Sequence, residues 1–399
     1  MMRPGPVVLL YWNPYGPRMR DAVSRHLAAV AAAAPPRGLV SFNAVGGAPS
    51  ALARLRPSAV ILHTTFLATR WLSSFGAWRE RGAWLGSLEA PKVALPQDDY
   101  DHADVLDEWL EELRVTAILT PLAEHTTLYR RTRDTARVRP VLTGYVDPRL
   151  ARTLTATVRP LRDRRFDVVY RATSLPYWFG RHGRLKRLVG DRAAAVAAAR
   201  GWAADISTSE VVTGRAWFEH LASGRTVVGC ESGSSVVDLR GEVRRRVQQL
   251  LQANPGATFD EVDARMPAGW DGAPFAALSP RHLEAAMTGT PQVLVRGAYS
   301  GVLEAGRHYL PVEPDLSDLA EALATALDPA VGRQLADAAR AELVESGSYD
   351  YERLTEVVRS ELPERIGSAS AWRAAAVAPA RLLAAARRGG SRLASRRAA

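Results

Sequence analysis

Residues 278–318 read LSPRHLEAAMTGTPQVLVRGAYSGVLEAGRHYLPVEPDLSD. Ser279 is a favoured helix N-cap and Pro280 suits the first helical position, so a helix is expected to begin there. A buried strand is expected from Pro291, and a second short helix is expected to begin near Ser300. The backbone N–H groups at such a helix start would suit a diphosphate. The stretch is therefore typical of an α/β domain with an anion-binding loop.

Strand–helix alternation extends outward from this stretch, which indicates parallel sheets covered by helices on both faces. The expected strands are Val7–Trp12, Leu39–Phe42, Ala59–His63, Lys92–Leu95, Thr116–Thr120, Val138–Val146, Phe166–Tyr170, Ala204–Ser207, Thr226–Cys230, Gln292–Val295 and Tyr309–Val312. A polar, arginine-rich stretch over 147–165 is predicted to be a linker. We therefore expect two Rossmann-like doubly wound domains, residues 1–150 and 166–365, facing a cleft.

The pattern of 278–318 resembles the donor domain of GT-B glycosyltransferases, closest to the family 4-like and CgeB-like group. The shared features are S-P-R-x-x-E-A-A-x-x-G-T, an apolar strand, Gly-x-Tyr-Ser-Gly and Gly-x-His-Tyr. The resemblance covers roughly residues 166–354. It matches Glu284 to the second glutamate of the family's Glu-x7-Glu motif, which binds the donor ribose. Ala276 stands where the first glutamate, the one that usually touches the transferred sugar, would fall.

The resemblance implies further residues around a nucleotide-sugar donor. Arg171 follows a buried strand, and Lys186 lies on the next helix; in similar enzymes such residues clamp the diphosphate. The strand ending at Cys230 continues into a small-residue loop expected to approach the nucleotide. The expected donor-binding residues are Arg171, Lys186, Glu231, Ser232, Gly233, Arg281, Glu284, Ser300 and Gly301. The alternatives are a solvated basic turn for Arg171, a tight turn with a helix cap at Glu231, and an ordinary exposed residue at Glu284.

The N-terminal domain is expected to hold the acceptor. His63 ends the apolar strand AVILH at the expected cleft, where related enzymes place a histidine, and Asp99 follows another strand. An aspartate there could act as general base toward an acceptor hydroxyl. Both assignments have a structural alternative, since His63 could cap a strand end and Asp99 a helix. No Asp-x-Asp with an accompanying histidine ends a strand, so no metal site is expected.

Charge is concentrated at the C-terminal end of the sequence. The net charge is +10, and no acidic residue follows Glu364, whereas eight arginines do. The remainder of the chain is therefore nearly neutral, which argues against nucleic acid as a partner. The basic tail, residues 366–399, is expected to contact an anionic membrane surface, with docking on the N-terminal domain or disorder as alternatives.

The sequence thus predicts a metal-independent glycosyltransferase that needs no cofactor beyond its nucleotide-sugar co-substrate. The family resemblance favours retention of anomeric configuration. The acceptor is expected to be a saccharide or a lipid-linked molecule of cell-envelope polysaccharide or glycolipid synthesis. One cysteine and no long apolar run indicate a cytoplasmic protein, peripheral at the membrane. A GT-B-fold sugar epimerase and a non-catalytic nucleotide-binding protein are the alternatives; a dehydrogenase is disfavoured because no G-x-G-x-x-G follows the first strand.

Overall fold

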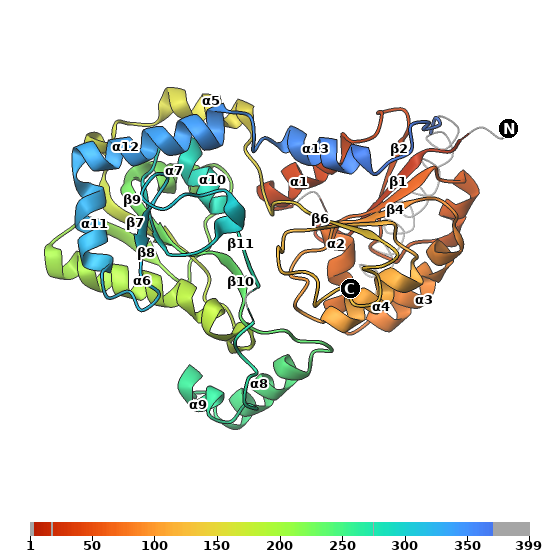
Figure 1. The fold of residues 1–399 in the computed structure, drawn as a ribbon, viewed down its shortest axis with the longest axis horizontal. Coiled ribbons are helices and arrows are strands. Elements are labelled where there is room, and N and C mark those ends of the chain that lie inside the picture. Colours follow the sequence, from red (N-terminus) through yellow and green to blue (C-terminus); the bar gives the residue numbers. More distant parts are fainter. Residues whose placement is uncertain (1–3, 17–18, 274, 370–399) are drawn as a thin grey trace, which may run out of the picture.

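The computed structural model describes residues 4–16, 19–273 and 275–369. Two α/β domains stand side by side in Figure 1, each built on a parallel sheet flanked by helices. Two doubly wound domains facing each other are the GT-B architecture, so the predicted fold class is confirmed. The predicted tail lies, apart from residues 366–369, outside the described residues.

The N-terminal domain has a six-stranded parallel sheet in the order β2-β1-β3-β4-β5-β6. The four central strands are buried because helices cover both faces of the sheet, whereas the two edge strands are partly exposed. Separate clusters of buried side chains lie on the two faces. Its strands are β1 (Val7–Tyr11), β2 (Leu39–Asn43), β3 (Ala59–Leu62), β4 (Lys92–Ala94), β5 (Ala117–Thr120) and β6 (Arg137–Pro140). Its helices are α1 (Asp21–Ala31), α2 (Thr64–Leu67), α3 (Phe75–Gly82) and α4 (Ala103–Glu112), with 3₁₀ turns η1 (Ser50–Leu55), η2 (Ala68–Trp71) and η3 (Ala83–Ser87).

The C-terminal domain has a five-stranded parallel sheet in the order β13-β12-β9-β7-β8. Its strands are β7 (Phe166–Arg171), β8 (Ala204–Ser207), β9 (Gly224–Gly229), β12 (Gln292–Val295) and β13 (Leu310–Val312). The helices are α6 (Gly180–Arg200), α7 (Arg215–Ser223), α10 (Pro280–Met287), α11 (Leu319–Leu327) and α12 (Pro329–Ala339), with short elements η5 (Tyr177–Phe179), η6 (Tyr299–Gly301) and η7 (Arg340–Glu345). The strand order reverses between β7 and β9, and ligands of such sheets bind beyond the carboxyl ends of the strands at this point.

The chain crosses between the domains twice. The stretch 147–165, predicted as a linker, instead contains α5 (Pro148–Thr157) and η4 (Leu161–Asp163), because Asp147 caps a helix that Pro148 begins. The last helix among the described residues, α13 (Tyr351–Ser360), returns and packs on α1 of the N-terminal domain (Figure 1). The two crossings meet where Val146 exchanges backbone hydrogen bonds with Tyr349 and Tyr351.

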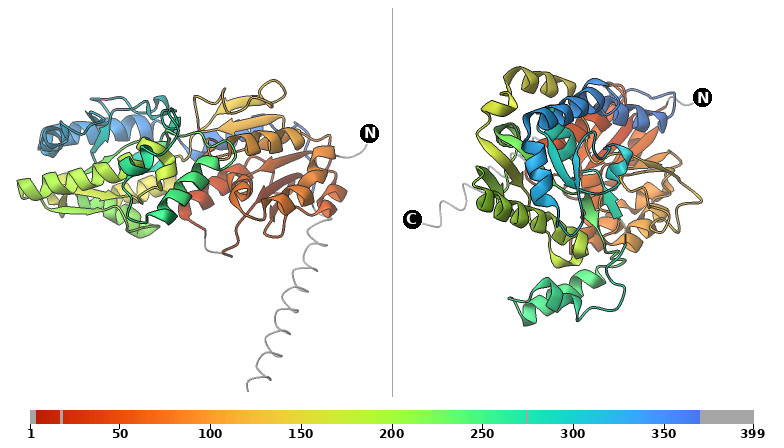
Figure 2. Two further views of the ribbon diagram at one scale, coloured as in Figure 1. Left: turned by 90° about the horizontal axis from the view of Figure 1, so that it is seen from below. Right: turned by 60° about the vertical axis from the view of Figure 1, so that its left-hand side comes forward.

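Two short strands were not predicted, and of the helical lobe between them only one helix was, since the sequence pattern predicts a helix over Leu239–Gln252. β10 (Ser232–Ser234) and β11 (Phe275–Ala277) pair antiparallel, and between them the chain forms α8 (Glu242–Ala253) and α9 (Phe259–Asp263). This lobe projects below both domains in Figures 1 and 2. Its small core includes Val247 and Val262, with aromatic side chains of η5 packed against it. β10 has the sequence Ser-Gly-Ser and so lacks the apolar run by which the other strands were recognised.

Candidate active site in the interdomain cleft

A first cavity lies at the carboxyl ends of the central strands of the C-terminal sheet. It has a volume of about 230 Å³ and is called here the inner cavity. Its lining combines residues of β7, β9 and β12, the start of α10, one side chain from α6 and two from α7. The lining residues are Tyr170, Arg171, Lys186, Trp217, Leu221, Val227, Val228, Gly229, Cys230, Ser232, Ser279, Arg281, His282, Gln292 and Leu294.

A second cavity, here the cleft cavity, is lined by both domains and has a volume of about 240 Å³. The N-terminal domain contributes Gln97, Asp98, Tyr100, Pro121, Leu122 and Thr143, and the C-terminal domain contributes Leu175, Phe179, Lys186, Ser232, Gly233, Ala277 and Pro280. Lys186 and Ser232 line both cavities. The two cavities therefore share a wall, and that wall carries a positive charge.

Lys186 of α6 supplies that charge. Its ammonium nitrogen lies 3.4 Å from Ser232 Oγ, a long hydrogen bond. Burial lowers the pKa of Lys186 below its usual value, while the carboxylate of Asp98 across the cleft acts in the opposite direction. A desolvated cation with a weak protein partner is suited to receiving an anionic ligand.

The two arginines predicted to bind the donor differ in whether their guanidinium groups are free to contact a ligand. Arg171 at the end of β7 is committed to Asp205, with Nη2 2.6 Å from Oδ1, and its side chain is only 11% exposed. Arg281 is exposed at the start of α10, donates to the backbone carbonyl of Arg171 at 2.6 Å, and lies over the ring of Trp217. The guanidinium at the mouth of the inner cavity is therefore that of Arg281, while Arg171 holds the adjacent strand ends together.

Glu284 lies one helical turn beyond Arg281 on α10. Its Oε2 accepts a hydrogen bond of 2.8 Å from the indole N–H of Trp217, a residue that lines the inner cavity. Burial raises the pKa of Glu284, and the guanidinium groups of Arg25 and Arg281 partly offset this effect. Among the described residues Oε1 has no hydrogen-bond partner, and it is not fully enclosed. One carboxylate oxygen is thus fixed and the other is available.

The carboxylate of Glu231, predicted to bind the donor, instead bonds to backbone N–H groups of the protein. Its Oε1 accepts the backbone N–H of Tyr299 at 2.5 Å, and the N–H of Ala298 also donates to this carboxylate. Gly297 makes this approach possible, because a Cβ there would lie 2.3 Å from Glu231 Oε2. The backbone amides expected to receive a diphosphate near Ser300 are therefore occupied by a protein carboxylate.

Ser300 and Gly301 belong to a left-handed turn. Three consecutive residues, Tyr299 to Gly301, have φ values of 45°, 54° and 73°. Ser300 Oγ accepts the backbone N–H of Leu278 at 3.0 Å, which ties this turn to the end of β11. The predicted short helix with a free N-terminus is thus wrong in its geometry, since the turn is left-handed and its first amides are bonded.

Gly233 and Ala276 face each other in the β10–β11 pair. Gly233 has a φ of 129°, and a Cβ there would lie 1.9 Å from the carbonyl oxygen of Phe275. Its small size is therefore required by strand pairing. Ser232, its neighbour, remains at the wall shared by both cavities.

His63 is fully buried and does not reach the cleft. Its Nε2 lies 3.0 Å from His26 Nδ1, and its Nδ1 accepts the backbone N–H of Thr65, which caps α2. Burial, with His26 adding to it, lowers the pKa of His63 well below its usual value. The proposed catalytic role of His63 is corrected here: a neutral imidazole enclosed in the N-terminal domain cannot contact an acceptor.

Asp99 is also fully buried. Its Oδ2 accepts hydrogen bonds from the hydroxyl groups of Thr120 and Tyr129, and burial raises its pKa. A carboxyl group enclosed in this way cannot act as base toward an acceptor, so this assignment is also corrected. Asp98 takes its place, because this half-buried residue lines the cleft cavity.

Asp98 is held in position by a residue that sequence reasoning missed. Arg70, which is 3% exposed, donates to the backbone carbonyls of Leu67, Gln97, Asp98 and Asp101 at distances of 2.8–3.1 Å. Asp98 has a φ of 53°, and its Oδ1 accepts the Tyr100 hydroxyl at 2.7 Å. The sequence signal was an arginine inside the otherwise apolar stretch TTFLATRWL.

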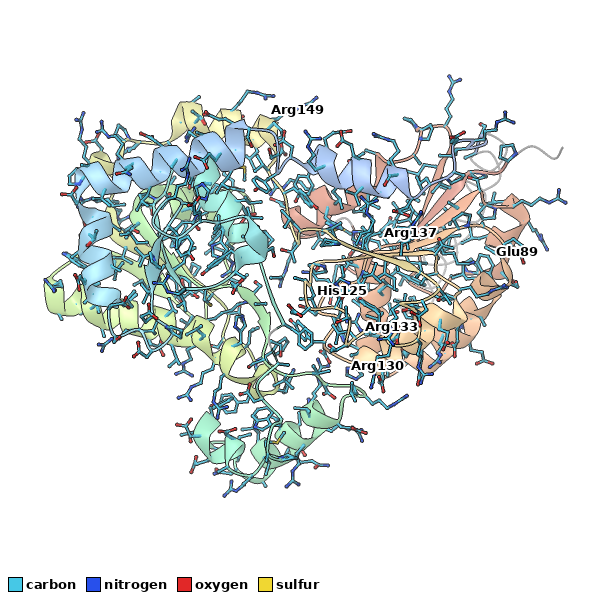
Figure 3. The ribbon with its side chains drawn as sticks, viewed as in Figure 1. Glu89, His125, Arg130, Arg133, Arg137 and Arg149 are labelled. Carbon is cyan, nitrogen blue, oxygen red and sulfur yellow. The ribbon has the colours of Figure 1, made fainter. Side chains whose placement is uncertain are left out.

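His125 is a further side chain at the cleft that the sequence did not single out. It belongs to the loop after β5, the loop that supplies Pro121 and Leu122 to the cleft cavity. Figure 3 shows His125 on the side of the N-terminal domain nearest to the C-terminal domain. Its Nδ1 lies 3.1 Å from the carbonyl oxygen of Leu122.

In the described part of the chain, no group of three or more histidine, cysteine, aspartate or glutamate side chains is placed to hold a metal ion.

Comparison with solved structures finds proteins of similar length. A sucrose-phosphate synthase from Thermosynechococcus elongatus is 15% identical over 89% of this chain and 98% of its own, with a TM-score of 0.46. HepE of Anabaena, solved with UDP and glucose, is 12% identical over 89% and 98%, with a TM-score of 0.44. AviGT4, a glycosyltransferase of avilamycin A biosynthesis, is 14% identical over 90% and 97%, with a TM-score of 0.43.

No protein-family model and no curated protein matches the chain. The helices among the described residues include none with the length and apolar character needed to cross a membrane.

Proposed function

We propose that the chain is a glycosyltransferase that binds a nucleotide-sugar in the inner cavity and an acceptor in the cleft cavity. The observation that carries this proposal is the shared wall at Lys186, with Arg281 on one side and Asp98 on the other. A cation between two adjoining cavities can hold a diphosphate leaving group, while a carboxylate in the second cavity can accept a proton from an attacking hydroxyl.

In this proposal the donor's diphosphate lies between Lys186, Arg281 and the start of α10. The helix start is suited to this because its first turn carries partial positive charge, although Pro280 has no N–H and the N–H of His282 is bonded to the carbonyl of Ser279. The free Oε1 of Glu284 accepts a ribose hydroxyl. These groups supply the positive charge that a divalent metal supplies elsewhere, so we propose that transfer is independent of metal and needs no cofactor besides the donor.

On the acceptor side, Asp98 is the proposed general base. The acceptor is proposed to be a saccharide or lipid-linked molecule of cell-envelope polysaccharide or glycolipid synthesis. Retention is also proposed, and it requires the acceptor hydroxyl to attack the sugar from the face that the diphosphate leaves, with Asp98 taking the proton of that hydroxyl as the bond to the diphosphate breaks. The basic residues after Glu364 would bring the protein to the cytoplasmic face of an anionic membrane.

An epimerase and a non-catalytic nucleotide-binding protein are less well supported. Asp98 and Tyr100 belong to the N-terminal domain, and a reaction confined to the donor would not need a second cavity lined by both domains. The methyl group of Ala276, where family members have a glutamate, is the feature that favours the non-catalytic alternative. Formation of a glycosylated product separates these possibilities.

The test begins with a thermal-shift screen of UDP-, GDP- and dTDP-sugars, since a ligand that binds only the native state raises the melting temperature. Turnover with the best donor is then measured with and without excess EDTA, and in Asp98→Asn. Asparagine tolerates the positive φ and keeps the bond from Tyr100, so kcat should fall by about 10²–10⁴ with donor affinity unchanged. Asp134→Asn, an exposed site, is the control.

Activity that survives EDTA, together with a selective loss in Asp98→Asn, is the expected result. If no nucleotide-sugar raises the melting temperature, the transferase proposal is wrong. If Asp98→Asn retains full turnover, the assignment of the base is wrong while the donor site stands.

A further inference from the structure

A third cavity lies on the C-terminal domain, away from the cleft. It has a volume of about 680 Å³ and lies between the segment 155–164 and the helices α11 and α12. It is called here the basal groove. Figures 1 and 2 show α5 and α12 running next to each other at this side of the domain, and η4 contacts α12. The volume falls within the range of ligand-binding pockets, about 300–1,000 Å³.

The basal groove is strongly basic. Six arginines line it and only two carboxylates do. The arginines are Arg159, Arg162, Arg164, Arg225, Arg333 and Arg340; the acids are Asp328 and Asp337. Arg225 is paired with Asp167, and Arg162 lies 3.7 Å from Asp163. Within the described ranges, the other four arginines have no carboxylate within 4.0 Å. Asp328 is occupied as the N-cap of α12, accepting the backbone N–H groups of Ala330 and Val331.

Arg164 and Arg340 are the innermost of these arginines, and no carboxylate of the described residues balances their positive charge. Arg164, 9% exposed, donates to Gly224, Thr288, Gly289 and Thr290. Its bonds are all to neutral oxygens, and its nearest charged neighbour is Arg340. Burial, with repulsion from Arg340, lowers its pKa to about 10. Two guanidinium groups held close together without an acid are stabilised when an anion binds near them.

The basal groove is separate from the inner cavity. Gly224 and Arg225 lie at the start of β9, whereas Gly229, at its end, lines the inner cavity. From Arg225, which lines the groove, to Gly229 there are four residue steps, which span about 13 Å; Val227 and Val228 between them line the inner cavity, and the two linings share no residue. The groove is therefore at the amino ends of the strands, on the opposite edge of the sheet from the proposed donor.

Apolar groups line the groove beside the arginines. They are Val158, Pro160, Leu161, Ala326, Leu327, Pro329 and Ala336. A purely inorganic anion would leave this surface without contact. A phosphate carried by a partly apolar molecule would contact both kinds of lining.

We propose that the basal groove is a second ligand site, which binds a phosphate or diphosphate group attached to a partly apolar molecule. Either a lipid headgroup or a soluble phosphate ester can present this chemistry. The proposal is independent of the function assigned to the cleft, because none of its residues lines either cleft-side cavity.

The test uses the full chain carrying Lys186→Ala, which removes the proposed diphosphate contact in the cleft. Pyrophosphate binding is measured by calorimetry in this background, alone and with a groove variant that carries one substitution, either Arg159→Glu or Arg333→Glu. Both arginines are exposed and lack a carboxylate partner among the described residues, so reversal of their charge should leave folding intact. Arg192→Glu, an exposed arginine on α6, is the matched control for net charge. A second arm measures co-sedimentation with phosphatidylcholine vesicles containing phosphatidic acid.

The groove variant is expected to lose about tenfold or more in pyrophosphate affinity, in vesicle binding, or in both, while Arg192→Glu loses neither. A loss with pyrophosphate alone identifies a soluble phosphate ester, and a loss that extends to vesicles identifies a lipid headgroup. If the groove variant and Arg192→Glu behave alike in both arms, the proposal is overturned.

Discussion

Asp98 and Asp99 are adjacent in the sequence and lie in opposite environments. The left-handed backbone at Asp98 directs this residue to the cleft cavity, while Asp99 points into the domain and bonds to Thr120 and Tyr129. Arg171 and Arg281 show a similar contrast: Arg171 is neutralised by Asp205, whereas Arg281 is exposed. At the scale of the residue, the partner of a charged group decides whether it can act on a ligand.

The contribution of Glu284 to folding stability can be tested separately from its contribution to donor binding. Glu284→Ala leaves the buried indole N–H of Trp217 without an acceptor, which should cost about 1–3 kcal/mol of folding stability. Glu284→Gln keeps that acceptor and should fold normally. Because burial raises the pKa of Glu284, the carboxylate contributes less to stability as pH rises through that pKa, so Gln should gain relative to wild type at higher pH. Melting temperatures across pH measure this.

Donor affinity then decides the role of Glu284 in binding. If Oε1 accepts a ribose hydroxyl, both variants should weaken donor binding in calorimetry, since an amide is a poorer acceptor than a carboxylate. Glu304→Gln, at an exposed position, is the control. Full donor affinity in Glu284→Gln would show that the side chain only positions Trp217.

Lys186 predicts a pH dependence of donor binding. Burial lowers its pKa, so its positive charge should be lost at a lower pH than that of an exposed lysine. Donor affinity should therefore fall as pH rises into the alkaline range. Lys186→Arg should retain affinity there, and Lys186→Ala should be weak at every pH, by about 1.5–3 kcal/mol. Parallel pH profiles for wild type and Lys186→Arg would contradict this account.

At the scale of the element, buried arginines fix the loops and helix ends that form the sites. Arg70 bonds to four backbone carbonyls and so holds the loop after β4. Arg164 does the same at the end of α10, where it takes the carbonyls of Thr288 and Gly289. Each guanidinium donates hydrogen bonds to backbone carbonyl groups, which add to the bonds that the loop makes within itself. The position of α10, and hence of Arg281 and Glu284, depends on such contacts.

Arg70→Lys tests this positioning role. An ammonium group cannot reach four carbonyls, so the variant should lose about 2–4 kcal/mol of stability. In the folded protein kcat should fall more than donor affinity, because the loop that moves carries Asp98 and not Lys186. Arg79→Lys, at a half-buried residue paired with Glu112, is the control. Equal losses in kcat and donor affinity would point to a general loss of structure.

At the scale of the whole molecule, the cleft is connected on two sides. On one side Val146 bonds to the backbone of Tyr349 and Tyr351, where the chain crosses between domains. On the other, residues 238–239 before α8 exchange backbone hydrogen bonds with residues 100–104 of the N-terminal domain. The ion pairs Arg244–Asp101 and Arg240–Glu108 reinforce this second connection. The lobe between β10 and β11 therefore joins the domains beside the cleft cavity.

Weakening the second connection should let the domains separate. Arg240→Ala with Arg244→Ala removes both ion pairs, and the loss of stability should be small because solvent screens exposed pairs. The radius of gyration without donor, measured by small-angle scattering, should increase and then return on adding donor. Arg246→Ala, exposed on the same helix, should change nothing. An unchanged radius in the double variant would show that the backbone bonds alone hold the lobe.

Local pattern was sufficient for most of the fold. Each predicted strand has a counterpart in the two sheets, because fully buried parallel strands are near-continuous apolar runs. The start of α10 at Ser279 and Pro280 was also readable, since proline suits the first helical position, although the Ser279 side chain makes no capping hydrogen bond. Wherever the physical cause lies within a few residues along the chain, the sequence by itself determined the structure.

The remaining features depended on contacts between distant residues. The amides near Ser300 are bonded to Glu231, 68 positions before Tyr299, and this could not be read from the loop itself. The burial of His63 beside His26, and the exchange of Asp99 for Asp98 at the cleft, follow from how helices pack on the sheet. Burial and pairing set the charge and reach of a polar side chain, and both arise only when the chain has folded. For this reason the sequence identified the segments of the site, while the tertiary structure decided which side chains face it.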